Sequence, residues 1–300
     1  MAEVWGVGTR VCAVIRRVPA AVACFALAAV LATGCNTFRK TSEAASLAKT
    51  KTEPKRSLSV DDFQRIAEDL NPSASKLGVV AGVEARSVIS RWIVSELAAP
   101  ALSAKGLDVT AQDVDDAKAG LAASEDGWSG FSAATQSMLI AERAPQAAVY
   151  NAGVQKSGVF CVKLLSFKDA AKATAASKDL ANGSKTIDQV AAENNQADTV
   201  VKDPNTAEDC AEASSAPLAA TVVTALASLP IGQPTQPVTD SGTTYIAVQR
   251  PYAEVAASLD TLFRGGVTGL ANQQAANEKI TVNSRIGMWD PTSGTVIATR

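Results

Sequence analysis

Residues 158–250 constrain the fold of this chain more than any other stretch. They open with an apolar run over 159–165 and close with a second run over 244–248, and both runs are rich in β-branched and aromatic residues. Such runs, bounded by turn residues, are typical of strands. The residues between the runs predict three helices, over 168–182, 186–195 and 218–229. The stretch is therefore expected to form a small sheet with helices packed against it.

The order of these elements resembles the parvulin type of peptidyl-prolyl isomerase domain. The resemblance is strongest where a helix ends at Leu229, the turn Gly232-Gln233 follows, and Pro237-Val238 leads into a paired strand over 242–248. It covers residues 158–250 and implies the parvulin fold for them. One departure is that 210–215 stands where the family has a glycine-rich strand.

The resemblance also locates the positions where parvulin chemistry would occur. Active parvulins place a pair of histidines on the central strands, and these would fall near Lys163 and near Thr244. The chain contains no histidine, and neither of these residues can replace a group that titrates near neutral pH. The resemblance thus implies degenerate active-site positions with no catalytic residue. An active isomerase is the alternative, since a dry groove that twists and desolvates the amide could act without histidine.

A peptide groove is the other feature that the resemblance implies. Leu218 and Val222 occupy the positions of the family's methionine and phenylalanine, and both are smaller, so a retained groove would be shallow. The alternative is that both are ordinary core residues of an amphipathic helix.

The N-terminus has the pattern of an export signal. Residues 1–34 carry Arg10, Arg16 and Arg17 ahead of an apolar run over 18–30, which is too short for a comfortable membrane span. Small residues directly before Cys35 resemble the bacterial lipoprotein box, in which the cysteine is lipidated. We therefore expect an extracytoplasmic protein anchored to the cell membrane through Cys35. Ordinary cleavage and secretion is the alternative.

Export also bears on the cysteines that remain after residue 35. These are Cys161 and Cys210, and two cysteines in an oxidising compartment usually bond. A disulfide between them would close a loop and stabilise the fold by ~4 kcal/mol in the chain-entropy model. The alternative is that Cys210 acts as the family's active-site cysteine.

The remaining chain predicts a helical domain around the parvulin-like unit. A polar, basic-biased stretch over 35–56 reads as a flexible tether, and helices follow within 57–152. Among these, 104–114 resembles a piece of the N-terminal domain of the SurA and PrsA chaperones, where a long helix ends and an acidic helix begins. In that family the terminal segment completes the helical domain. We therefore expect an α+β protein with a parvulin-like domain over 153–252 inserted in a helical domain that 253–300 completes with two helices and a hairpin.

Composition and motifs exclude several classes of function. A net charge of −2 argues against a nucleic-acid partner, and there is no P-loop, nucleophile elbow or metal-spaced cysteine pair, so no cofactor or metal is expected. The favoured function is a membrane-anchored, chaperone-like foldase that binds unfolded or newly exported polypeptides. The alternatives are an active prolyl isomerase and a structural or interaction lipoprotein.

Overall fold

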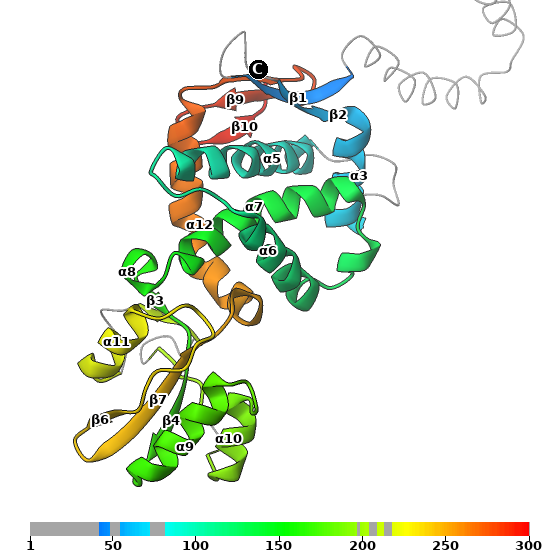
Figure 1. Cartoon of the computed structure of the whole chain (residues 1–300). Coiled ribbons are helices and arrows are strands. Elements are labelled where there is room, and N and C mark those ends of the chain that lie inside the picture. Colours follow the sequence, from blue (N-terminus) through cyan, green and yellow to red (C-terminus); the bar gives the residue numbers. More distant parts are fainter. Residues whose placement is uncertain are drawn as a thin grey trace, which may run out of the picture.

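The chain folds into a larger helical part and a smaller part built around a sheet (Figure 1). The computed structural model describes residues 42–48, 55–72, 82–196, 199–203, 209–212 and 218–299. The predicted signal peptide over 1–34 and the predicted lipidation site Cys35 lie outside the described residues. The predicted α+β class is confirmed.

The helical part is formed by two segments of the chain that flank the smaller part in sequence. Its elements are β1 (Glu43–Ala48), β2 (Arg56–Ser59), α3 (Val60–Leu70), α5 (Gly82–Ser103), α6 (Ala111–Ser124), the 3-10 turn η2 (Trp128–Gly130), α7 (Ala133–Asn151), α12 (Tyr252–Ala275), β8 (Lys279–Val282), β9 (Met288–Asp290) and β10 (Thr295–Ile297). The smaller part contains α8 (Val154–Ser157), β3 (Val159–Phe160), β4 (Val162–Phe167), α9 (Ala170–Ala181), α10 (Ile187–Glu193), β5 (Ala211–Glu212), α11 (Ala220–Ala227), β6 (Val238–Asp240) and β7 (Thr243–Gln249).

Helix α12 is the central element of the helical part. Its apolar side, which includes Val255, Leu259 and Phe263, is buried in the main core with residues of α5, α6 and α7. Helix α6 approaches it closely at Gly120, where an added Cβ would lie 2.7 Å from the Cβ of Ala256. The sequence predicts two helices here, separated at Gly265-Gly266, and the structure shows one continuous helix. Burial along the whole length outweighs the roughly 1 kcal/mol that each glycine costs in a helix.

Strand β1 corrects the prediction of a tether over 35–56. Residues 43–48 form the middle strand of an antiparallel sheet with the order β2-β1-β8, and the side chain of Leu47 is only 1% exposed. The tether interpretation rested on the polar neighbours of this short apolar stretch. Its partners lie at 56–59 and 279–282, and the second of these is too distant in sequence to produce a local pattern. Residues 43–48 are therefore a strand that the sequence did not predict.

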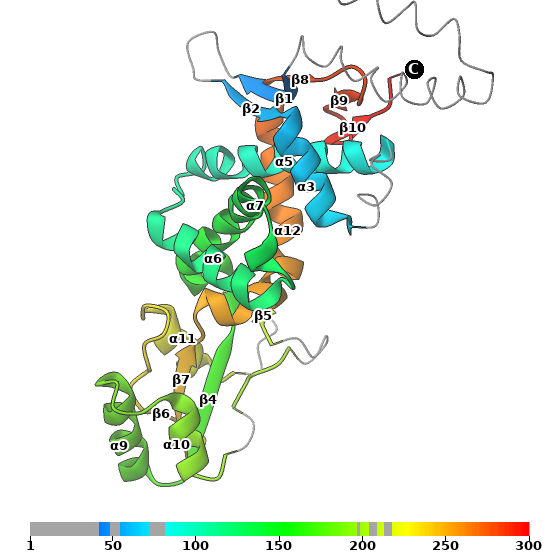
Figure 2. The same cartoon turned by 90° about the vertical axis from the view of Figure 1, so that its right-hand side faces the viewer.

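The carboxyl-terminal strands gather at the same end of the molecule as β1 (Figure 2). β9 and β10 form the predicted hairpin. Its turn is closed by Asp290, whose side chain accepts hydrogen bonds from the Thr292 backbone N–H at 2.9 Å and from the Ser293 hydroxyl at 2.8 Å. In the described part of the chain, no helix is both long enough and apolar enough to cross a bilayer.

The smaller part is a three-stranded antiparallel sheet, with the order β4-β7-β6, covered on both faces. Leu165, Phe167 and Ile246 point to one face and pack under α9 and α10. Val162 and Ala247 point to the other face and pack under α11. Alternation of side chains along the strands produces these two layers.

Candidate functional site

The two predicted active-site positions, Lys163 and Thr244, lie on one face of the sheet but do not meet. Lys163 pairs with Val248 and Thr244 pairs with Phe167, so four ladder positions separate them. At the rise of an extended strand this corresponds to about 13 Å. A pair of side chains acting on one peptide bond is therefore not formed at these positions.

Each of the two side chains also has a local partner. The Nζ of Lys163 donates to both carboxylate oxygens of Asp188 on α10 at 2.8 Å. Thr244 is 4% exposed, and its hydroxyl lies 3.0 Å from that of Thr239 on β6. Lys163 borders a hollow of about 220 Å³, and Thr244 does not.

Leu218 and Val222, the predicted groove residues, lie at the opposite face of the sheet from Lys163. Val222 is 1% exposed and belongs to the cluster formed with Val162 and Ala247, and Leu218 is half-buried against the same cluster. The structure thus does not bring the predicted groove residues together with the predicted active-site positions. Val222 occupies a core position.

Cys161 and Cys210 are joined by a disulfide with a Cα–Cα distance of 4.3 Å. Both cysteines are buried, and the bridge lies beside the short antiparallel pairing of β3 with β5. Cys210 is therefore not available as a free thiol in this structure.

The feature best suited to bind another molecule is a hollow of about 520 Å³ where the helical part meets the smaller part. We call it the junction hollow. Its apolar lining includes Leu107 before α6, Ala148 of α7, Tyr252 of α12 and Ile231 of the smaller part. Its polar lining includes three carboxylates, Asp108, Asp113 and Asp116, and the described residues that line it include no lysine or arginine. An apolar floor with an acidic rim is the result.

The acidic rim is positioned by the start of α6 and the end of α7. Thr110 caps α6, and its backbone N–H donates to the Oδ2 of Asp113 at 2.8 Å in a capping box. From α7, the Nδ2 of Asn151 donates to Asp113 and to Asp116, each at 2.8 Å. These bonds fix two of the carboxylates, so the negative charge has a defined place next to the apolar floor.

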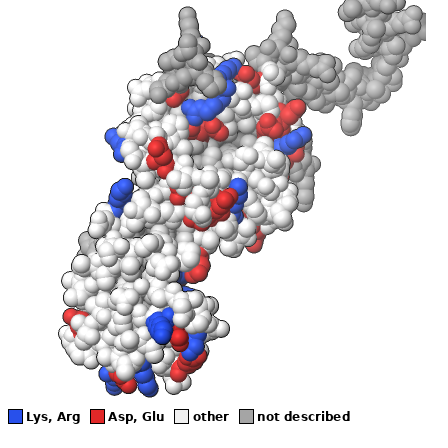
Figure 3. All heavy atoms as spheres, in the orientation of Figure 1, with Lys and Arg blue, Asp and Glu red and all other residues white. Residues whose placement is uncertain are grey.

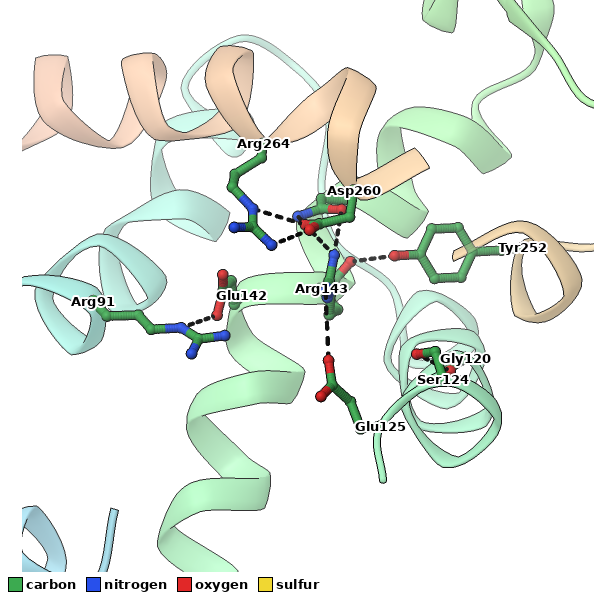
Figure 4. A network of polar contacts seen from close by, with 10 residues as sticks. Arg91, Gly120, Ser124, Glu125, Glu142, Arg143, Tyr252, Asp260 and Arg264 are labelled. Atoms are coloured by element: carbon green, nitrogen blue, oxygen red, sulfur yellow. Dashed lines mark hydrogen bonds and ion pairs between the residues drawn. The ribbon is translucent and has the colours of Figure 1, made fainter. Parts of the chain in front are cut away.

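A network of ion pairs and hydrogen bonds links α7 to α12 and includes Tyr252, which lines the junction hollow (Figure 4). Arg143 of α7 forms an ion pair with Asp260 of α12, and both side chains are largely buried. Asp260 also accepts a hydrogen bond from the Nε2 of Gln146 at 3.1 Å and pairs with Arg264. The hydroxyl of Tyr252 donates to the backbone carbonyl of Arg143 at 3.4 Å. The network thereby fixes the first turn of α12, which lines the hollow.

Burial and charge act in opposite directions on the acidic member of this network. Burial acts to raise the pKa of the Asp260 carboxyl, but the hydrogen bond from Arg264 and the charge of Arg143 outweigh it and hold that pKa below its ordinary value. For Tyr252, burial raises the pKa of the hydroxyl far above its ordinary range. Asp260 is thus ionised and Tyr252 neutral near pH 7.

Charged side chains in the described part of the chain form no metal centre, and the face seen in Figure 3 carries no large patch of one charge. The face in Figure 3 carries basic and acidic side chains close to one another, separated by wide uncharged areas. Within the described ranges, no group of three or more metal-binding side chains comes together.

The sequence contained only part of the signal for the junction hollow. The capping residues Thr110 and Asp113 are recognisable in the sequence, and they locate the start of α6. Asn151, Ile231 and Tyr252 carry no local mark of a site, because their meeting depends on how the smaller part packs on the helical part.

No protein-family model and no curated protein matches the sequence. Among solved structures, the chain is similar to the peptidylprolyl isomerase PrsA of Bacillus anthracis, with 15% identity over 63% of this chain and 94% of that chain and a TM-score of 0.21. It is also similar to the foldase protein PrsA of Lactococcus lactis, with 13% identity over 81% of this chain and 95% of that chain and a TM-score of 0.28.

Proposed function

We propose that this chain is a chaperone-like foldase, anchored to the extracytoplasmic side of the cell membrane through Cys35, that binds unfolded or newly exported polypeptides without isomerising proline. The observation that carries the proposal is the junction hollow. Its apolar floor can cover exposed apolar side chains of an unfolded polypeptide, and its acidic rim favours segments that also carry lysine or arginine.

The contacts of Lys163 and Thr244 support the absence of isomerase activity. Lys163 is held in an ion pair with Asp188, and Thr244 is buried against Thr239. A residue that polarises or desolvates a prolyl amide has to reach it. Neither side chain is free to do so in this arrangement.

The proposed anchor would determine which end of the molecule faces the membrane. If Cys35 is lipidated, the residues 36–42 that precede Glu43 can span at most roughly 25 Å. The strand-rich end would then lie near the membrane surface, and the junction hollow would lie farther along α12 (Figure 1). Replacement of Cys35 by alanine should release the protein from the membrane fraction.

Suppression of client aggregation tests the proposed function. The full chain is inserted into lipid nanodiscs and mixed with a chemically unfolded client, and light scattering is followed against empty nanodiscs. We expect the wild type to suppress scattering and Ile231→Asp to lose most of this effect, because the variant places a charge on the apolar floor. Leu262→Asp is the matched control, since Leu262 is an exposed apolar residue of α12 outside the hollow.

Two results would contradict the proposal. One is equal protection by the wild type and Ile231→Asp, which would remove the hollow from the mechanism. The other is rotation of a proline peptide above background by the same preparation, which would show the alternative function, an active isomerase.

A further inference from the structure

A second hollow, of about 460 Å³, lies at the opposite end of α12 from the junction hollow. We call it the edge-strand hollow. It is lined by β8 through Ile280, Thr281 and Val282 and by β9 through Met288 and Trp289, with Glu278 at its side. Figure 2 shows β8 and β9 beside each other at the strand-rich end.

Both strands that line this hollow present an unused backbone edge. β8 pairs with β1 on one edge, and β9 pairs with β10 on one edge. Among the described residues, neither strand has a strand partner on its other edge. Exposed edges of this kind are templates for the addition of another strand.

Two buried polar atoms at the hollow lack partners. The Nε1 of Trp289, a donor, and the Oε2 of Glu278, an acceptor, are buried without a hydrogen bond. The Glu278 side chain is only 2% exposed, and its other oxygen lies 3.5 Å from Arg56. Buried polar groups are nearly always satisfied, so an unsatisfied donor and an unsatisfied acceptor on two residues that line one hollow require explanation.

We infer that the edge-strand hollow binds an extended segment of a client polypeptide by strand addition; the inference rests on the proposed function, because the occupant is a piece of the same clients. A peptide unit carries one N–H and one C=O, and these match the carboxylate of Glu278 and the indole N–H of Trp289. The apolar side chains of Val282 and Met288, the latter 52% exposed, provide contact for alternate residues of the segment. The free carboxylate oxygen favours a neutral or basic segment over an acidic one.

Fluorescence anisotropy with the full chain in nanodiscs tests this inference. The probe is a fluorescein-labelled peptide in which valine alternates with threonine and lysine. The control probe has the same sequence with alternate backbone nitrogens methylated, which removes the donors along one edge. We expect the plain probe to bind and the methylated probe to bind at least tenfold more weakly.

Two variants test whether the probe binds in the edge-strand hollow. Trp289→Phe keeps an aromatic ring and removes the N–H donor. We expect this variant to bind the plain probe about fivefold to tenfold more weakly, which is the range for the loss of one hydrogen bond. Leu262→Asp, at an exposed position of α12 outside both hollows, should leave probe binding unchanged. Circular dichroism of both variants establishes that they fold.

The outcomes separate this inference from the proposed function. Equal binding of both probes, or no effect of Trp289→Phe, would overturn strand addition even if client aggregation is suppressed. Probe binding that Trp289→Phe weakens, without any suppression of aggregation, would support the site and contradict the chaperone proposal. The protein could also form dimers, detected by light scattering, that do not bind the probe. A second copy of the chain would then occupy the strand edges, and the inference would be overturned.

Discussion

The ion pair between Arg143 and Asp260 permits a quantitative test of how the helical part is held together. Both side chains are close to fully buried, at 9% and 12% exposed. Removal of one partner from a buried pair costs about 3–5 kcal/mol, because the other charge is left without compensation. Removal of both charges in favour of apolar residues is often neutral.

The partners that remain around each charge predict which single variant loses more stability. Asp260→Leu leaves the Arg143 charge with Glu125, whose Oε1 lies 3.7 Å away, and with a neutral hydrogen bond to the Oε1 of Gln146 at 3.4 Å, so we expect the upper end of that range. Arg143→Met leaves Asp260 with Arg264 and Gln146, so we expect the lower end, about 3 kcal/mol. The double variant should lie within about 1 kcal/mol of the wild type, because no uncompensated buried charge remains.

Urea unfolding, followed by circular dichroism, measures the free energy of unfolding of the wild type, the two single variants and the double variant. Asp260 also predicts a pH dependence, because its folded-state pKa is held below the ordinary value. Its stabilising contribution is present above roughly pH 4 and is lost as the pH falls through the folded-state pKa. The stability difference between the wild type and Asp260→Leu should therefore shrink below pH 4. Single variants that cost less than about 1 kcal/mol, or costs that add in the double variant, would refute the reasoning.

Three further predictions concern stability and are measured by the same unfolding experiment. Gly120→Ala should cost about 1–3 kcal/mol, because the added methyl forces α6 away from α12. Replacement of Cys161 and Cys210 by alanine should cost ~4 kcal/mol, given their separation of 49 residues, and a reductant should have no further effect on that variant. Leu47→Ala should cost about 2–5 kcal/mol, as for a buried core residue, whereas Ser42→Ala, at an exposed position just before β1, should have little effect.

Local signals in the sequence explain why most helix boundaries could be predicted. Ser59, Thr110 and Thr186 each cap the helix that follows them, as their positions in the sequence indicate. A capping side chain bonds to a backbone N–H two or three residues away, so the determinant lies within the same short stretch. The same holds for the hairpin turn at Asp290.

Features that depend on distant partners could not be predicted in this way. β1 is stabilised by β8, more than two hundred residues later, and Gly265-Gly266 is kept helical by the packing of α12. The alternation along β4 and β7 shows that a sheet has two faces, but it does not show which helix covers which face. The parvulin resemblance assigned Val222 to a peptide groove and Lys163 to an active-site position, and alternation alone could not show that they lie on opposite faces of the sheet.

The two proposed binding surfaces together predict how binding should depend on the length of a client. Tyr252, the first residue of α12, lines the junction hollow, and Ala275, its last residue, lines the edge-strand hollow. A helix of 24 residues is about 36 Å long, and an extended chain needs roughly eleven residues to cover that distance. Peptides of fifteen residues or more should therefore bind more tightly than peptides of eight, because the second contact becomes intramolecular once the first has formed. Titration of a peptide length series, repeated with Ile231→Asp, measures this gain. An affinity that rises smoothly with length and is unaffected by the variant would show that the two surfaces do not act on one chain.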